Sequence, residues 1–123
     1  VFLTRNPKNN IDMYVIPGIN ESSISASDKI ISTTSSTTQV LALMVKMLDE
    51  AFGLQRAMMT TVHAYTADQP LADAAGADLR RSRSAVENII PNTTKAPDLV
   101  KKIMPQYEGK IEGIAFNVPV PYG

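Results

Sequence analysis

Apolar residues recur along this chain with the periods of strands and of helices. Apolar or alternating runs at residues 1–4, 12–16, 54–65 and 111–120 predict four strands. In the last run Ile114, Phe116 and Val118 alternate with Ala115 and Asn117, which gives that strand two different faces. Turn-forming residues separate the first two strands, and the chain is predicted to form loops over residues 17–28 and from about residue 67 to 84.

Two stretches show the three- and four-residue spacing of amphipathic helices. The first helix is expected from about residue 35 to the glycine at 53, because apolar side chains recur there at Leu41, Met44, Leu48 and Phe52. The second is expected over residues 96–107, with a proline in its first turn and with Leu99, Val100, Ile103 and Met104 facing inward.

Composition narrows the class of protein. With 44% hydrophobic and 20% charged positions in 123 residues, the chain resembles one soluble globular domain or part of one. Twelve basic residues balance twelve acidic ones, so we expect no nucleic-acid partner and no attraction to anionic lipid. No apolar run approaches the roughly 20 residues of a membrane span, and no leader opens the sequence, so we expect a cytoplasmic protein without a membrane partner.

Two further features bear on the chemistry. The chain contains no cysteine, which excludes a disulfide, a thiolate metal site and a cysteine nucleophile within it, and we expect no metal site. It opens inside an apolar run without methionine and stops at the end of a predicted strand, so we interpret it as a fragment.

Hydroxyl residues occupy every position from 32 to 38, just where the first helix is expected to start. The first turn of a helix has unpaired N–H groups and a partial positive charge, so a phosphate would be stabilised there. The alternative is that Ser35 or Ser36 only caps the helix. The two roles can coexist.

The single histidine and a basic cluster are the other candidates. Period-two geometry places His63 on one strand face with Thr61 and Tyr65, and this face would line a site. From its position alone, His63 is as consistent with a hydrogen-bonded structural histidine as with a catalytic one. The cluster Arg80, Arg81 and Arg83 lies in a predicted loop, where a solvated face or an interdomain contact is the simpler interpretation.

Several motifs, taken in order, resemble one enzyme family. The segment at 31–42, ISTTSSTTQVLA, is similar to the nucleophile segment S-N-A-S-C-T-T-N-C-L-A of the phosphorylating glyceraldehyde-3-phosphate dehydrogenases. TTVHAYT at 60–66 resembles the strand with that family's catalytic histidine, and DLRRSRSA at 78–85 with NIIPNTT at 88–94 resembles its cofactor and phosphate loop. MYVIPGIN at 13–20 and GIAFNVPVP at 113–121 are similar to the exit from the cofactor domain and to a strand of the catalytic sheet.

The resemblance implies a fold, an activity and partners. We expect an α/β chain of the α+β type, with a mixed, largely antiparallel sheet and helices on one face. Residues 1–30 would end the NAD-binding domain, and residues 31–123 would form part of the catalytic domain. The implied activity is the glycolytic, NAD-dependent oxidative phosphorylation of an aldehyde in a homotetramer, with a phosphorylated substrate and phosphate as ligands. Erythrose-4-phosphate dehydrogenases share the pattern. The glycine-rich turn that holds the NAD pyrophosphate is absent.

Site residues follow from the same resemblance, residue by residue. His63 matches the catalytic histidine, and Ser36 matches the position of the cysteine nucleophile. The family's substrate and phosphate contacts map to Ser35, Thr37, Thr66, Arg83, Thr94 and Asn117.

The chain departs from the family pattern at its most important positions. A serine hydroxyl starts several pKa units above a thiol, so Ser36 is a poorer nucleophile than cysteine. Asn117 stands where an arginine would give a bidentate phosphate contact, and Gln39 and Val40 replace the asparagine and second cysteine. We therefore expect little dehydrogenase turnover, and a catalytically silent homologue kept for binding or assembly is the alternative. Acyl transfer by Ser36 with His63 is a third hypothesis, although no carboxylate that would orient the histidine is identifiable.

Overall fold

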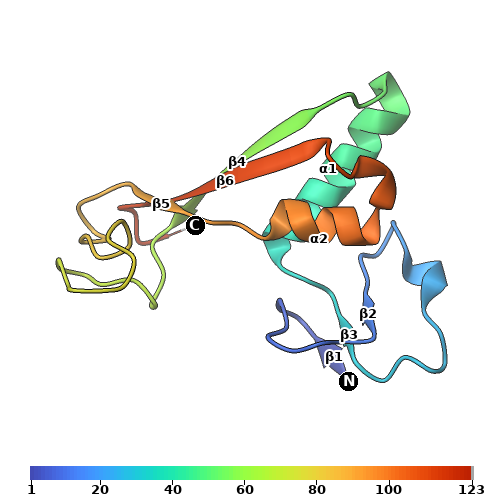
Figure 1. The fold of residues 1–123 in the computed structure, drawn as a ribbon, viewed down its shortest axis with the longest axis horizontal. Coiled ribbons are helices and arrows are strands. Elements are labelled where there is room, and N and C mark those ends of the chain that lie inside the picture. Colours follow the sequence, from blue (N-terminus) through green and yellow to red (C-terminus); the bar gives the residue numbers. More distant parts are fainter. Residues whose placement is uncertain (123) are drawn as a thin grey trace. The chain divides into compact units, whose positions relative to one another are not determined.

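The computed structural model describes residues 1–122 as a mixed α/β chain with two α-helices and two three-stranded sheets among these residues (Figure 1). This confirms the expected α/β class. The strands and helices are β1 (Phe2–Leu3), β2 (Met13–Tyr14), β3 (Ile31–Ser32), α1 (Ser36–Phe52), β4 (Ala57–Ala64), β5 (Ile90–Asn92), α2 (Ala96–Ile103) and β6 (Ile111–Val118). Short 3₁₀ helices form at Glu21–Ser23 and Pro105–Tyr107.

The chain divides into two compact units. The first consists of Val1–Ala57 and Lys95–Glu112, and the second of Met58–Thr94 and the chain from Gly113 onward.

A small parallel sheet lies in the first unit. β3 is its central strand and pairs in parallel with β1, with Phe2 opposite Ile31, and with β2, with Met13 opposite Ile31. The strands predicted at 1–4 and 12–16 are therefore confirmed, with two paired residues each. The central position buries β3, where Ile31 is 5% and Ser32 0% exposed.

The helix α1 begins and ends where its sequence signals predict. The Ser35 hydroxyl accepts a hydrogen bond from the N–H of Thr38, and Gly53, at φ 73°, ends the helix. Thr38, Leu41, Ala42 and Val45 are buried, whereas Met44, Leu48 and Phe52 are exposed. The buried stripe thus includes the small residues Thr38 and Ala42, and Leu41 is the one residue of the predicted spacing that belongs to it.

The helix α2 packs beside α1 in the first unit. Its predicted inward residues Leu99, Val100 and Met104 are buried, and Ile103 is half-buried. The α-helix stops at Ile103, earlier than the predicted residue 107, because Pro105 disfavours helical geometry at the preceding residue. Met104 accordingly has φ −130° and ψ 77°, and the last residues form the 3₁₀ turn.

The second sheet has the order β4-β6-β5. The strands predicted at 54–65 and 111–120 are confirmed as β4 and β6, although both are shorter. The sequence did not predict β5, which pairs antiparallel to β6 with Ile90 opposite Asn117 and Pro91 opposite Phe116. A proline is compatible with this strand because β5 is an edge strand, where a missing N–H can face away from the ladder. Within residues 1–122, neither helix is long and apolar enough to cross a membrane.

A buried tyrosine links the end of α1 to the turn after α2. The Tyr107 hydroxyl donates to Oδ2 of Asp49 over 2.8 Å, and Oδ1 of Asp49 accepts from the N–H of Leu54. The Leu54 and Tyr107 hydrogen bonds, in that order, lower the pKa of Asp49. Burial and the same hydrogen bond raise the pKa of Tyr107 to about 12.

We predict that Tyr107→Phe lowers the free energy of unfolding at neutral pH by about 1 kcal/mol, the net contribution of one hydrogen bond. The Tyr107 contribution is complete below the ordinary tyrosine pKa of 10.0 and is lost as pH rises toward about 12. The Asp49 contribution is present above the ordinary carboxyl pKa of 3.8 and is lost as pH falls below it. Urea unfolding across pH measures both limits. Tyr122→Phe is the matched control because Tyr122 is 85% exposed; equal stability of the Tyr107→Phe variant and the unmodified protein would refute the link.

Candidate functional site

The turn from β3 into α1 holds its backbone in an unfavourable conformation. Thr34 has φ 64°, which is rare for a β-branched residue and costs about 1–3 kcal/mol. Thr34 is fully buried, and its N–H donates to the Ser32 hydroxyl over 3.0 Å. The Ser32 hydroxyl in turn donates to the carbonyl of Arg5 over 2.8 Å. Strain of this kind concentrates at functional sites, so the turn is a candidate on structural grounds alone.

The turn delivers three hydroxyl residues to the start of α1. Ser35 is the N-cap, and its Oγ lies 2.9 Å from Oγ1 of Thr38 in a shared hydrogen bond. Ser36 is the first residue of the helix and is exposed, and Thr37 is half-buried. The prediction that Ser36 lies in the first helical turn is confirmed. No acidic residue lies in that turn, so the helix field there is not offset by a neighbouring carboxylate.

Gln39 fixes the helix start to the strand before it. Its Nε2 donates to the carbonyl of Thr33 over 2.7 Å, which spans the strained residue. Gln39 therefore has a structural role in the turn.

In the second unit, His63 lies near the end of β4 and is an exposed residue. Its Nδ1 is 2.8 Å from the carbonyl oxygen of Ala64. A carbonyl only accepts, so Nδ1 carries the proton of this hydrogen bond. In the neutral ring Nε2 is then the nitrogen that can accept a proton.

Asn117 on β6 shares the same carbonyl. Its Nδ2 donates to the oxygen of Ala64 over 3.0 Å, and its Oδ1 accepts from Nδ2 of Asn92 over 3.1 Å. Asn117 is only 8% exposed. The Ala64 carbonyl and the amide of Asn92 were missed by sequence reasoning, because only the register of β5 on β6 brings Asn92 close to Asn117.

Thr66 and Arg83 have acidic partners. The Thr66 hydroxyl donates to Oδ1 of Asp68, and this hydrogen bond is the main cause that lowers the pKa of Asp68. Arg81 pairs with the same carboxylate over 3.1 Å, and Arg83 pairs with Asp73 over 3.4 Å. Both carboxylates are largely exposed, so these pairs contribute little stability and can exchange for a ligand.

The structure brings the predicted residues together in two groups. Ser35, Ser36 and Thr37 belong to the first unit, and His63, Thr66, Arg83, Thr94 and Asn117 belong to the second. The predicted proximity of Ser36 to His63 stays a prediction, as does the domain boundary at residue 30. Over residues 1–122 no cluster of three histidine or acidic side chains is arranged to hold a metal ion.

Comparisons with known proteins match nearly the whole chain. Residues 35–123 match the sequence model of the family described as glyceraldehyde 3-phosphate dehydrogenase, C-terminal domain. A glyceraldehyde-3-phosphate dehydrogenase of Streptomyces coelicolor is 47% identical over 118 residues, which cover 95% of this chain and 35% of that protein. The proteins of the same name from Mycobacterium tuberculosis and Mycobacterium leprae are 44% and 42% identical over 117 residues, covering 95% of this chain and 34% of each. The chain thus spans about a third of the length of these relatives.

We predict that Ser35→Ala destabilises the protein by about 1 kcal/mol, because the N–H of Thr38 loses its capping partner. Ser36→Ala, at the exposed neighbouring position, should change stability by no more than about 0.5 kcal/mol. Denaturant unfolding of both variants measures the difference. Equal losses in the two variants would contradict the assignment of Ser35 as the cap.

Proposed function

We propose, because the chain belongs to the glyceraldehyde 3-phosphate dehydrogenase family, that it is part of a glycolytic, NAD-dependent oxidoreductase in which serine has replaced the nucleophilic thiol. The observation that carries the proposal is Ser36 at the first position of α1, directly after the strained turn. The substrate would be a small phosphorylated aldehyde, and the protein would be a cytoplasmic homotetramer.

NAD would have to be held by residues outside this chain. The six glycines of the sequence nowhere form the G-x-G-x-x-G turn that receives a dinucleotide pyrophosphate. The three-stranded parallel sheet of the first unit does not replace that turn, so we assign no NAD contact and no hydride step to these residues.

The chain's own contribution is to position a nucleophile and a base. The exposed first turn of α1 offers N–H groups and a positive field that favour an anion at position 36. A thiol there would be shifted toward its thiolate, but a serine hydroxyl starts too high to ionise appreciably. His63 would accept a proton through Nε2, because the hydrogen bond to Ala64 holds the proton on Nδ1.

Phosphate contacts are proposed at Ser35, Thr37, Thr66, Thr94 and Arg83. Two observations indicate that these contacts would bind phosphate weakly. The Ser35 hydroxyl already serves the helix cap, and the Thr66 hydroxyl already faces a carboxylate. Asn117 already uses its amide in the sheet, where Nδ2 donates to the carbonyl of Ala64 and Oδ1 accepts from Asn92, and it offers a phosphate only a neutral donor. We therefore propose weaker phosphate binding than a charged arginine would give.

A catalytically silent homologue kept for binding or assembly is the second candidate. Two features favour it. Ser36 is a poor nucleophile, and the buried Asn117 uses both its amide nitrogen and its amide oxygen for hydrogen bonds inside the sheet. In that case the residues that position His63 are retained for folding.

We predict that the protein with Ser36 produces no measurable NADH from glyceraldehyde 3-phosphate, and that Ser36→Cys raises the rate at least about a thousandfold. Removing a nucleophile costs a hydrolase roughly 10⁶ in turnover, which sets the scale. Absorbance of NADH in the complete protein is the readout, and Ser36→Ala is the control. Robust turnover of the unmodified protein that Ser36→Ala abolishes would show that the serine is a competent nucleophile. No turnover after Ser36→Cys would favour the silent homologue.

A further inference from the structure

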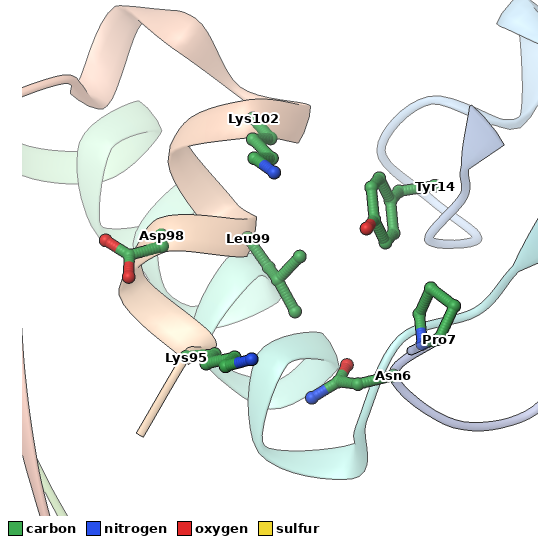
Figure 2. A pocket seen from close by; sticks show the side chains of 7 residues that line it. All are labelled: Asn6, Pro7, Tyr14, Lys95, Asp98, Leu99 and Lys102. Carbon is green, nitrogen blue, oxygen red and sulfur yellow. The ribbon is translucent and has the colours of Figure 1, made fainter. Parts of the chain in front are cut away.

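A pocket in the first unit is lined by charged and apolar groups. It lies between α2 and the segment before β2 and has a volume of about 230 Å³. We call it the α2 pocket; its lining residues are Asn6, Pro7, Tyr14, Lys95, Asp98, Leu99 and Lys102 (Figure 2).

The field in the α2 pocket is positive. Figure 2 shows the ammonium groups of Lys95 and Lys102 directed toward the space beside Leu99, whereas the carboxylate of Asp98 points away from it. That carboxylate is paired with Lys101, with Oδ1 and Nζ 2.9 Å apart. Two cations therefore face one cavity without a carboxylate between them, an arrangement whose mutual repulsion an anion would relieve.

One of these cations lies over an aromatic ring. The Nζ of Lys102 is 5.9 Å from the centre of the Tyr14 ring, which is within the range of a cation–π contact. Lys102 is exposed, and this contact places its ammonium beside a ring that lines the pocket. Leu99, which is 6% exposed, and Pro7 form an apolar wall beside it.

Asn6 contributes a buried acceptor that lacks a donor. Its Oδ1 is fully buried and accepts no hydrogen bond from any residue among 1–122. A buried, unsatisfied carbonyl oxygen costs about 1–3 kcal/mol, so a ligand hydroxyl or N–H that reached it would recover that energy. The pocket is therefore complementary to a ligand that has both a negative charge and a hydrogen-bond donor.

The size of the pocket limits the ligand. At about 30 Å³ for each water, 230 Å³ corresponds to about eight waters, which excludes a dinucleotide and suits a ligand of about ten non-hydrogen atoms.

We propose that the α2 pocket binds a small hydroxylated anion, with its charged group between Lys95 and Lys102 and a hydroxyl donating to Asn6. The pocket uses none of the residues assigned to the nucleophile, base or phosphate contacts, so this inference does not depend on the proposed dehydrogenase function.

The test compares two probes that differ in their hydroxyl groups. Glycerol 3-phosphate has both the charge and the hydroxyls, and propyl phosphate keeps the charge alone. Calorimetric titration of the complete protein should show glycerol 3-phosphate binding at least about fivefold more tightly, the value of one recovered hydrogen bond. Asn6→Leu should abolish this preference. Equal affinity of the unmodified protein for both probes would overturn the proposal, and this comparison needs no variant to fold.

Variants then locate the site. Lys102→Met should weaken both probes at least about tenfold, because it removes a charge-assisted contact while keeping the side-chain length. Lys95→Met serves the same purpose if Lys102→Met does not fold. Lys29→Met, an exposed lysine outside the pocket, should change affinity by less than about twofold. An equal loss from Lys29→Met, or from Thr37→Val at the start of α1, would show that the anion binds elsewhere and that the proposal is wrong.

Discussion

The left-handed backbone at Thr34 is the constraint on which the candidate site depends. A β-branched residue keeps φ 64° only when its surroundings determine it more strongly than its own sterics. Here the Ser32 hydroxyl joins the turn to Arg5 on one side and to Thr34 on the other, and Gln39 reaches back to Thr33. These hydrogen bonds fix the first turn of α1 relative to the parallel sheet. The exposed position of Ser36 follows from this arrangement.

A second constraint fixes the histidine in its own unit. The carbonyl of Ala64 receives hydrogen bonds from both His63 and Asn117, and Asn117 is held by Asn92 on the edge strand β5. The sequence offered no carboxylate to orient the ring, and the structure shows that a backbone carbonyl does so. Asn117 is thus a positioning residue for this carbonyl.

Local signals predicted much of this fold. The hydroxyl run and Gly53 located both ends of α1, because caps depend on residues within one turn. The apolar spacing that located α1 did not identify its buried stripe, since Thr38 and Ala42 are buried by contacts that residue size does not reveal. The strand β5 was not predicted from the sequence, and it contains Pro91, a residue uncommon in strands. The helix α2 is shorter than predicted because of Pro105. The carbonyl of Ala64 is 53 positions from Asn117 in the sequence, and the residues that line the α2 pocket are up to about 96 positions apart. No local sequence pattern can predict contacts over such separations.

The central proposal is that position 36 is the nucleophile position of this family and that His63 acts on it. Because the chain has no cysteine, Ser36→Cys introduces a single thiol into it, and the pH dependence of its alkylation by iodoacetamide reports that thiol's pKa. We predict a pKa below the ordinary value of about 8.5 in Ser36→Cys, and a higher pKa when His63→Ala is added. An ordinary pKa that is the same with and without His63 would contradict the account.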